Sequence, residues 1–559
     1  EDADRIIQGK LKYYGRHWKD VGNPPNWFLN PFNQAMYPEA DRHWTELPDF
    51  HPQVGDIKNV WEASRFEWLV TLARAYAVTG EAAYLSTLNS WLKDWVEKNP
   101  VNIGPNWKCG QEAAIRVFDL LLAALILQQW QAPSPALQEF IFRHLQRIKT
   151  NIRYALAQDN NHGTSEAAAL FIAGNWLAET GFIKASGFAR KGRAHLEERV
   201  VKLVEKDGSF SQHSVTYHRV MLDTLCFAEI WRKKMDQPFF SSDFYDKARA
   251  ASDWLWMLSD EESGNAPNLG SNDGAMFLNS HGCDYRNFRP GIQLSQALFR
   301  NQAFFPDGPW DEPLYWFDIN KEDLQIEPPL KQNKILDQSY AVMQSGNSWG
   351  MLRLPGYRFR PGHNDVLHFD LWFNGKNICR DGGSFTYNPG DAGLDKYFKS
   401  VLAHNTASFD KQEQMPRIGR FLMGRWIKPD FVSNIESNHD GTMSCRAAYT
   451  DHLGRTHQRC IEWKNDVWKV VDQFKGNYEM VQARYRLLPE QYSINGHILT
   501  ASWGQMEVLT PDCEVRLEKG LESLYYWEKQ DVELLVVTGG VECRRIVVRI
   551  DLENGGCER

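Results

Sequence analysis

The chain has 559 residues, of which 43% are hydrophobic and 24% charged, and its formal net charge is −8. This length exceeds what one core normally supports, so we expect two large domains or more. The negative balance argues against broad nucleic-acid binding, and no run of about 18 apolar residues predicts a membrane span. An anionic ligand stays possible, because Lys and Arg can cluster locally.

Aromatic residues make up 13% of the chain and include 22 Trp. Large flat rings suit sugar-binding clefts and also fill cores, so composition leaves both roles open. The nine cysteines form no CxxC pair, which argues against a zinc ribbon or a redox motif. Their odd number leaves at least one free thiol unless an intermolecular bridge forms.

Residues 60 to about 300 carry apolar side chains at three- and four-residue spacing, which predicts helices in series. Gly and Pro separate these runs, and the short connections predict antiparallel helix hairpins. The expected helices cover 61–79, 82–98, 110–129, 135–158, 164–180, 190–206 and 214–233.

Residues 306–337 are rich in Pro, Asp and aromatic residues and are predicted to form a linker. From Tyr340 onward, short alternating runs between turn residues predict an antiparallel sandwich. The expected strands include 349–354, 368–373, 442–449, 458–463, 467–472, 481–488, 534–538 and 545–550. We therefore predict an N-terminal incomplete (α/α) toroid over 1–305, this linker, and a C-terminal antiparallel β-sandwich over 338–559.

Asn160-Asn161-His162-Gly163 is the first of three polar clusters, and it interrupts a helical run. At a helix start, Asn161 and His162 would add side-chain donors to a terminus that already favours anions. The alternative is a capping segment in which Thr164 or Asn161 is the cap.

The second cluster runs from Asp207 to Arg219, where an Asp-Gly turn leads into a predicted helix. His213 and Tyr217 are four residues apart, so we expect them on one helix face. A tyrosine near a cation loses its proton more readily and can act as acid or base. The alternative is a packed helix start in which Tyr217 bonds to a neighbour.

The third cluster combines 360–370, 380–383 and 403–406, which are rich in His and Asp. Histidine and aspartate from separate strands can place two nitrogens and one oxygen around a divalent ion. Asp365 or Asp370 can then orient an imidazole from outside the ligand shell. The alternative is that His–Asp pairs tie sheet edges together.

Weaker polar segments lie at 110–116, with Gln111 and Arg116, and at 267–274. Cleft-lining, capping and salt-bridge roles are all compatible with them. No Gly-rich stretch matches a dinucleotide fingerprint or a P-loop, so we expect no nucleotide cofactor.

Together these segments resemble the heparinase II/III-like polysaccharide lyase superfamily, which includes glycosaminoglycan lyases and exo-type alginate lyases. The resemblance covers most of the chain and rests on the order and spacing of short motifs. The matching motifs are Asn160–Gly163, Asp207–Gly208 with Tyr217–His218, His363–Asp365 with His368–Trp372, Asp381–Gly383 with Tyr387–Asn388, and His404–Thr406.

The resemblance implies cleavage of a uronate-containing polysaccharide by β-elimination, in which a proton leaves C5 and O4 is expelled. It implies that Asn161 and His162 neutralise the sugar carboxylate. Tyr217 is then expected to transfer the proton, with His162 or His213 as the alternative base.

The resemblance further implies a divalent metal, Zn, Mn or Ca, that holds loop geometry in the sandwich through His363, Asp381 and His404. Many relatives carry a second His two positions before the His that matches His363, but this chain has Pro361 there. Whether His363 binds metal or substrate therefore stays open. The residues expected to bind flanking sugars are Gln111, Arg116, Arg360 and Tyr387.

The expected partner is an anionic polysaccharide of the heparan sulfate/heparin, hyaluronan or chondroitin type, and Arg353, Arg358 and Arg360 favour sulfated chains. The alternatives are an alginate or other uronan lyase, a toroid hydrolase using two carboxylates among Glu112, Glu166 and Asp273, and a non-catalytic glycan-binding protein. Because polymeric uronans occur outside the cytoplasm, a periplasmic or secreted location is favoured. The start at Glu1 instead of Met is compatible with a removed leader.

Overall fold

A computed structural model describes residues 1–326, 328–336, 339–419 and 422–553. The chain divides into two compact units. The first contains Glu1–Phe210, Tyr217–Asp253 and Gly274–Pro328, and the second contains Ser211–Thr216, Trp254–Asp273 and Pro329–Arg559. Two short segments from the helical part of the sequence thus belong to the second unit. Residues 337 and 338, where the predicted linker ends and the predicted sandwich begins, lie outside the described residues.

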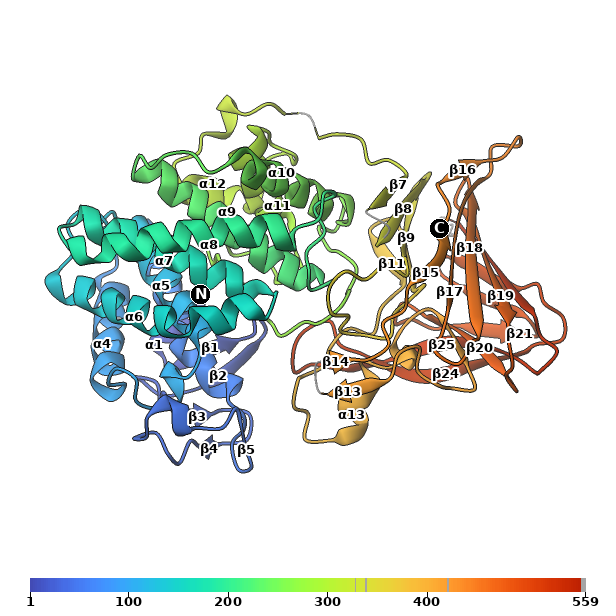
Figure 1. Cartoon of the computed structure of the whole chain (residues 1–559), viewed down its shortest axis with the longest axis horizontal. Coiled ribbons are helices and arrows are strands. Elements are labelled where there is room, and N and C mark those ends of the chain that lie inside the picture. Colours follow the sequence, from blue (N-terminus) through green and yellow to red (C-terminus); the bar gives the residue numbers. More distant parts are fainter. Residues whose placement is uncertain (327, 337–338, 420–421, 554–559) are drawn as a thin grey trace. The chain divides into compact units, whose positions relative to one another are not determined.

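The first unit is built mainly from helices (Figure 1). The helices of the described chain up to residue 326 are α1 (Asp2–Ile7), α2 (Lys58–Trp61), α3 (Glu67–Thr79), α4 (Ala82–Lys98), α5 (Gly110–Ile126), α6 (Pro135–Ala157), α7 (Asn161–Glu179), α8 (Ser186–Leu203), α9 (Val215–Lys234), α10 (Ser242–Met257), α11 (Arg289–Arg300) and α12 (Glu312–Trp316). Short hairpins precede α2: β1 (Lys10–Tyr13) with β2 (His17–Asp20), β3 (Leu29–Asn30) with β4 (Ala35–Met36), and β5 (Phe50–His51) with β6 (Gly55–Asp56).

The helices form an inner and an outer set, as in an incomplete toroid. α5 packs against both α3 and α7, while α4, α6 and α8 pack beside their sequence neighbours. All 17 residues of α5 are buried, which is typical of a helix surrounded by others. The predicted helix 61–79 begins later, at Glu67, because Phe66 has a left-handed backbone (φ 75°) that interrupts the first turn.

Tryptophan mostly serves the core. Sixteen of the 22 Trp side chains are buried. In the first unit, Trp68 contacts Trp91 at 5.2 Å between ring centroids, and Trp95 contacts Trp107 at 6.1 Å. Most of the aromatic excess that we identified in the sequence therefore does not need a ligand to explain it.

The second unit contains three large antiparallel sheets (Figure 1). One has the order β11 (Lys376–Cys379), β10 (Phe369–Phe373), β9 (Ser348–Arg353), β8 (Tyr340–Ser345), β7 (Lys334–Leu336). Another has the order β12 (Ala407–Phe409), β20 (Val481–Arg486), β25 (Gln530–Gly539), β24 (Glu514–Glu522). The largest runs β15 (Pro429–Val432), β17 (Met443–Thr450), β18 (Thr456–Lys464), β19 (Val467–Lys475), β26 (Arg545–Leu552), β23 (Gly504–Val508), β22 (Ile498–Ala501), β21 (Ser493–Asn495), with β16 (Glu436–Ser437) paired to β17. Smaller elements are β13 (Arg417–Gly419), β14 (Leu422–Met423) and α13 (Ala392–Tyr397).

One apolar cluster joins the three sheets. It includes Leu371 of the first sheet, Val537 of the second and Ile550 of the third, each fully buried. Inner faces that share one core define a sandwich. The predicted fold class, a helical toroid followed by an antiparallel β-sandwich, is confirmed. No helix among the described residues is long and apolar enough to cross a bilayer.

The Asp207-Gly208 turn before α9 requires glycine for two reasons. Gly208 has φ +97°, and a Cβ there would clash with the carbonyl oxygen of Ala250. We expect Gly208→Ala to lower the free energy of unfolding by about 1–2 kcal/mol because of the left-handed backbone. Overpacking should lower it by about 1–3 kcal/mol more. The melting temperature should fall accordingly.

Gly181→Ala is the matched control, because Gly181 has φ +96° with nothing within 4 Å of the added Cβ. Its free energy of unfolding should fall only by the cost of the left-handed backbone. Equal melting temperatures for the two variants would contradict the tight contact at Gly208.

Candidate active site

Asn160 caps α7. Its side-chain oxygen accepts a hydrogen bond from the His162 backbone N–H at 3.0 Å. Our two sequence candidates for the cap, Thr164 and Asn161, are therefore wrong: Asn161 lies inside the first turn, and the Thr164 hydroxyl donates to the Asn161 carbonyl at 2.9 Å. Asn161 and His162 occupy the first turn of α7, where backbone N–H groups favour anions.

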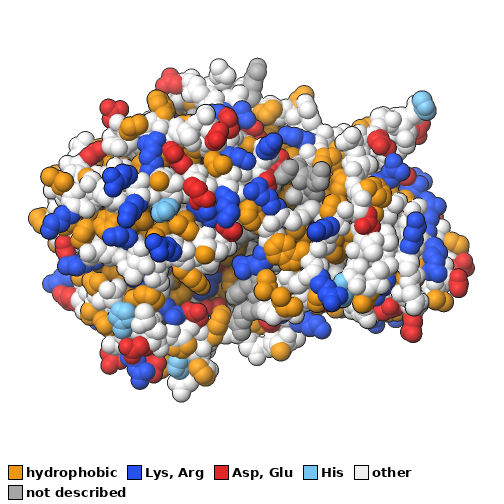
Figure 2. Space-filling view, in the orientation of Figure 1, with side chains coloured by type: hydrophobic (Ala, Val, Ile, Leu, Met, Phe, Trp, Pro, Cys, Tyr) orange, Lys and Arg blue, Asp and Glu red, His pale blue; other side chains and the backbone are white. Residues whose placement is uncertain are grey.

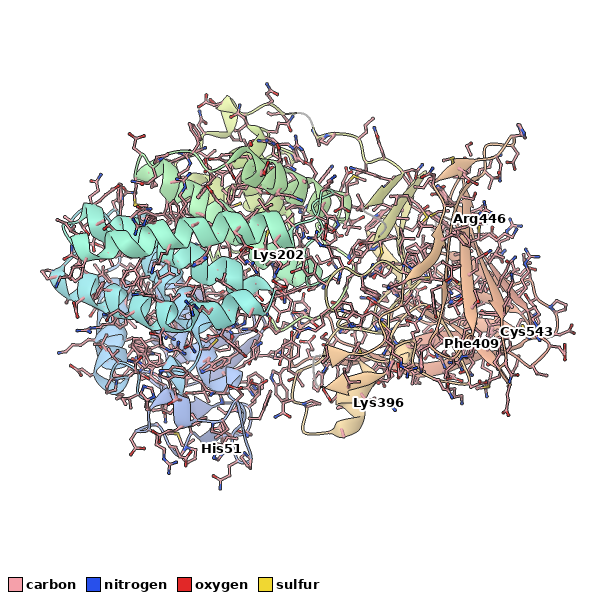
Figure 3. All side chains as sticks on the ribbon, in the orientation of Figure 1. His51, Lys202, Lys396, Phe409, Arg446 and Cys543 are labelled. Atoms are coloured by element: carbon pink, nitrogen blue, oxygen red, sulfur yellow. The ribbon has the colours of Figure 1, made fainter. Side chains whose placement is uncertain are left out.

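The turn before α7 is tied to α8. Asp159 accepts hydrogen bonds from Arg199 at 2.8 Å and from Lys202 at 2.7 Å; Figure 3 labels Lys202 on this helix. A Cβ on Gly163 would lie 3.0 Å from the Arg199 side chain. Glycine at 163 thus makes room for the arginine that fixes the start of α7.

The predicted residue Gln111 is brought to the same place. The Ser165 Oγ lies 2.7 Å from the Asn161 carbonyl oxygen and within hydrogen-bond distance of the Gln111 side-chain oxygen, so its single proton is shared between these two acceptors. The first turns of α5 and α7 therefore meet, and Gln111 and Asn161 are linked through one hydroxyl.

His162 is paired within its own helix. Its Nδ1 lies 3.6 Å from Glu166 Oε1, and 27% of the His162 side chain is exposed. Burial by itself lowers the pKa of His162, but interactions with Cys109 and Glu166 outweigh it and raise the pKa above its ordinary value. A protonated imidazole beside two helix N-termini forms a site suited to a carboxylate.

The segment before α5 is held by buried side chains. Trp61 donates to the Pro105 carbonyl at 2.8 Å and Arg116 donates to the Asn106 carbonyl at 2.8 Å. Arg147 donates to the next two carbonyls, those of residues 107 and 108, at 2.7 and 2.5 Å. A buried loop needs such partners for its backbone, so this segment is rigidly placed.

Arg116 is therefore a core residue. Its side chain is 0% exposed, donates to His144 at 2.9 Å and lies over Trp95 and Trp107. Burial lowers its pKa to about 9. We do not include Arg116 among the groups proposed to contact substrate, because it presents no surface.

Tyr217 and His213 lie in different settings. Tyr217 is a buried residue of α9 in the first unit, whereas His213 precedes α9, has φ 49° and belongs to the second unit. The predicted shared helix face is therefore wrong, since α9 begins only at Val215. Burial and the nearby Arg353 lower the pKa of His213 to about 3, so its imidazole is neutral. Its ring packs edge-on against Tyr357 at 5.5 Å.

The predicted metal ligands come together in the second unit. His363, Asp381 and His404 are buried, and one ligand atom from each lies within 4.8 Å of the others. His404 Nδ1 lies 2.7 Å from Asp381 Oδ2. His363 Nδ1 and His404 Nε2 are buried without a hydrogen-bond partner among the described residues. Two unpartnered imidazole nitrogens beside a carboxylate fit a divalent cation.

His–Asp pairs also tie strands together beside this cluster, as our alternative for the third cluster predicted. His368 Nε2 lies 3.4 Å from Asp370 and 3.7 Å from Asp381, and its Nδ1 accepts from the Asn405 backbone at 2.8 Å. His368 thus connects the carboxylate of the cluster to β10. Sequence spacing did not distinguish this histidine from the ligand candidates.

The remaining predicted substrate residues lie in the second unit. Arg360 is exposed and Tyr387 is half-buried. The Tyr387 backbone N–H donates to the Tyr526 hydroxyl at 2.8 Å. Both stay predictions as substrate contacts.

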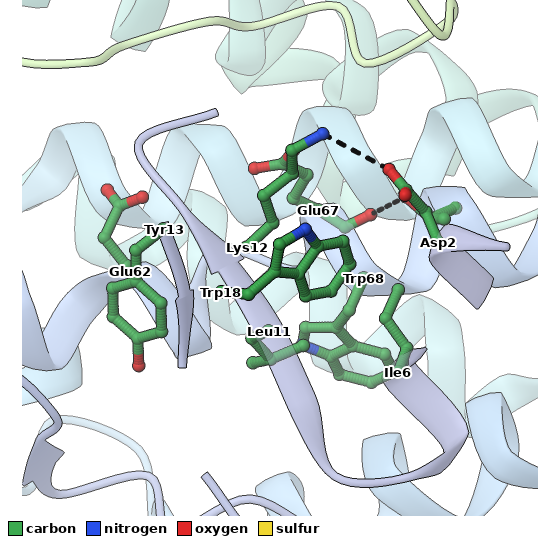
Figure 4. A pocket seen from close by; sticks show the side chains of 10 residues that line it. Asp2, Ile6, Leu11, Lys12, Tyr13, Trp18, Glu62, Glu67 and Trp68 are labelled. Atoms are coloured by element: carbon green, nitrogen blue, oxygen red, sulfur yellow. Dashed lines mark hydrogen bonds and ion pairs between the residues drawn. The ribbon is translucent and has the colours of Figure 1, made fainter. Parts of the chain in front are cut away.

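A separate small pocket, with a volume of about 30 Å³, lies in the first unit (Figure 4). It is bordered by Lys12, Trp18, Glu62 and Glu67, and Lys12 pairs with Asp2 at 3.3 Å. Burial and the Glu62 charge raise the pKa of Glu67 to about 7. None of the site residues predicted from the sequence lines this cavity.

Two family models match the chain. The model described as heparinase II/III N-terminus matches residues 19–269, and the one described as heparinase II/III-like, C-terminal, matches residues 330–549. The chain is 24% identical over 430 residues to heparin-sulfate lyase of Bacteroides thetaiotaomicron, covering 72% of this chain and 58% of that relative. It is 22% identical over 398 residues to heparin-sulfate lyase of Bacteroides stercoris, covering 64% and 55%. The matches thus span less than two thirds of either relative.

Solved structures share the fold. A heparinase III crystal structure aligns with a TM-score of 0.70 at 18% identity, covering 99% of this chain and 85% of that chain. Heparan sulfate lyase HepC from Pedobacter heparinus aligns with a TM-score of 0.60 at 20% identity, covering 99% and 82%.

The buried His–Asp–His cluster predicts metal binding that can be measured directly. Protein purified without chelator should contain about one divalent ion per chain by elemental analysis, with Zn, Mn and Ca as the candidates. His404→Ala should lower the metal content and the melting temperature. His439→Ala, which removes an exposed histidine from the same unit, should change neither. Metal-free wild-type protein that melts at the same temperature as protein supplied with each ion would contradict the site.

Proposed function

Because the chain belongs to the heparinase II/III family, we propose that it is a polysaccharide lyase that cleaves uronate-containing glycosaminoglycans by β-elimination. The observation that carries the proposal is the first turn of α7, where an amide and a raised-pKa imidazole lie together at a helix N-terminus. The heparin-sulfate lyase relatives favour heparan sulfate or heparin over hyaluronan and chondroitin.

The proposed mechanism begins with charge neutralisation. Removal of the C5 proton places negative charge next to the uronate carboxylate, and this developing charge opposes the reaction. Asn161 and His162 would donate to the carboxylate and stabilise the charge as it forms. Removing one such donor should raise the barrier by about 3–4 kcal/mol, by analogy with oxyanion holes.

Proton transfer is assigned to Tyr217. As the candidate base, its phenolate would take the C5 proton, and the phenol formed in this way would then donate that proton to O4 as the C4–O4 bond breaks. His213, neutral at ordinary pH, stays an alternative base from the second unit. A divalent ion at His363, Asp381 and His404 would supply a fixed positive charge that orders the surrounding loops.

The settings of two carboxylates that we considered for a hydrolase, Glu112 and Glu166, favour a hydrolase less than a lyase. Glu112 is buried and receives two hydrogen bonds from Arg65, at 2.7 and 2.8 Å. Glu166 is 2% exposed and paired with His162. Both carboxylates are thus already paired with basic side chains of the protein, whereas a glycosidase needs two carboxylates that flank the scissile bond.

The surface is compatible with an anionic substrate despite the net charge of −8. Figure 2 shows many Lys and Arg side chains on the visible face, interspersed with Asp and Glu and with neutral residues. We also propose a periplasmic or secreted location, because polymeric glycosaminoglycans are encountered there.

The proposed chemistry can be tested with a substrate panel of heparan sulfate, heparin, hyaluronan, chondroitin sulfate and alginate. Lyase action should give unsaturated uronate products, seen by ultraviolet absorbance and by mass, preferentially from heparan sulfate. Saturated products would select a hydrolase, turnover of alginate alone would select an alginate lyase, and binding without turnover would select a glycan-binding protein.

Tyr217→Phe should lower kcat by about 100-fold to 10,000-fold, the usual contribution of a positioned acid or base. Tyr154→Phe is the matched control, because Tyr154 is an exposed tyrosine of the same unit. It should leave turnover unchanged. Near-normal turnover by a folded Tyr217→Phe variant would remove this residue from the proposed role.

A further inference from the structure

Glu166 lies one helical turn after His162, with its carboxylate enclosed. The residue is 2% exposed, and its Oε1 atom lies 3.6 Å from His162 Nδ1. Its Oε2 atom is buried without a hydrogen-bond partner among the described residues. A buried carboxylate is costly unless a charge or a donor compensates it. His162 is the group that can do so from the same helix.

Gly110 at the start of α5 provides the space for this carboxylate. A Cβ at position 110 would lie 2.5 Å from Glu166 Oε2 and 2.9 Å from Oε1. The Gly110 backbone is not in the left-handed region, so its conformation does not require glycine. An added Cβ would instead displace the Glu166 carboxylate.

Other charged and titratable groups face the pair from the neighbouring helices. Cys109 precedes α5 and interacts with His162, while Arg147 of α6 interacts with Glu166. Arg147 is already committed to the carbonyls of residues 107 and 108. Arg199 of α8 packs against Gly163 and pairs with Asp159 and Glu198. His162 is thus the group in direct ion-pair geometry with the Glu166 carboxylate.

We propose that Glu166 is a positioning residue that keeps His162 doubly protonated, with Nδ1–H directed to Glu166 and Nε2–H left to donate to the substrate's uronate carboxylate. The substrate carboxylate in this proposal comes from the proposed function, on which the role of Glu166 therefore rests. A cationic donor binds a carboxylate more strongly than a neutral one. The i, i+4 spacing on α7 fixes the ring orientation as well as its charge.

The electrostatics of the pair agree with this role. Burial lowers the pKa of His162, but the interactions with Cys109 and Glu166 raise it by more than burial lowers it. The pKa of His162 is therefore above its ordinary value. Burial raises the pKa of Glu166, while His162 acts in the opposite direction. Removing the Glu166 charge should therefore let the His162 pKa fall. As the pH rises, the His162 imidazolium would then lose its proton at a lower pH than it does in the wild type.

The test follows the His162 imidazole by NMR titration, with its signal assigned by comparison with His162→Gln. In Glu166→Gln we expect its pKa to fall by at least about one unit, the scale of a typical environmental shift. Glu179→Gln removes the same charge from the exposed far end of α7 and should leave the titration unchanged. An unchanged His162 pKa in folded Glu166→Gln would overturn the proposal.

Gly110→Ala provides a second variant that keeps every charge. Its Cβ would displace the Glu166 carboxylate, so the His162 pKa should fall here too, although alanine is the better helix former. Should Glu166→Gln not fold, Gly110→Ala and Glu166→Asp carry the same comparison. Wild-type titration in both would overturn the role.

Activity gives the second readout. In Glu166→Gln the high-pH limb of kcat/KM should move to lower pH, with about a 10-fold loss one pH unit above the new His162 pKa. A uniform loss at every pH would indicate damage to structure alone and count against the positioning role. The NMR titration does not need turnover, so its failure contradicts this proposal, whereas absence of unsaturated products from the wild type contradicts the proposed function.

Discussion

The placement of the site depends on buried donors that satisfy the backbone just before α5. Trp61, Arg116 and Arg147 take up the carbonyls of residues 105–108, in a core rich in tryptophan. Because buried carbonyls need hydrogen-bond donors, these side chains hold the segment in place. The first turn of α5 follows directly, and α7 is attached to it through Ser165. The geometry around Asn161 is therefore set by the core below it.

Much of the fold could be predicted from the sequence, because apolar periodicity reports directly which face of an element is buried. The helix predicted at 82–98 coincides with α4, and the strand predicted at 467–472 lies within β19. Boundaries were less accurate where the backbone departs from the periodic pattern, as at Phe66. The segments 211–216 and 254–273 belong to the second unit because of their long-range contacts, which a local sequence pattern does not reveal.

The candidate site was predicted in part. Asn161 and His162 do lie at a helix start, and His363, Asp381 and His404 do come together. No sequence pattern indicated that Arg116 is enclosed by aromatic rings, since an arginine on a helix is usually exposed. The sequence analysis considered Glu166 only as a hydrolase carboxylate and did not pair it with His162. The structure shows the pair, and the space at Gly110 accommodates the buried carboxylate.

The interleaved course of the chain has a consequence for dissecting this protein. Asn268 donates to the Ser523 carbonyl at 2.8 Å, and Trp349 donates to Asp260 at 3.3 Å. The sheets of the second unit therefore bond to residues from the helical half of the sequence. Cutting the chain after residue 328 would leave both fragments with orphaned surfaces: one would carry segments without their sheet, and the other a sheet without its covering. The second unit is therefore not one continuous range of the sequence, because it includes Ser211–Thr216 and Trp254–Asp273 from the helical half.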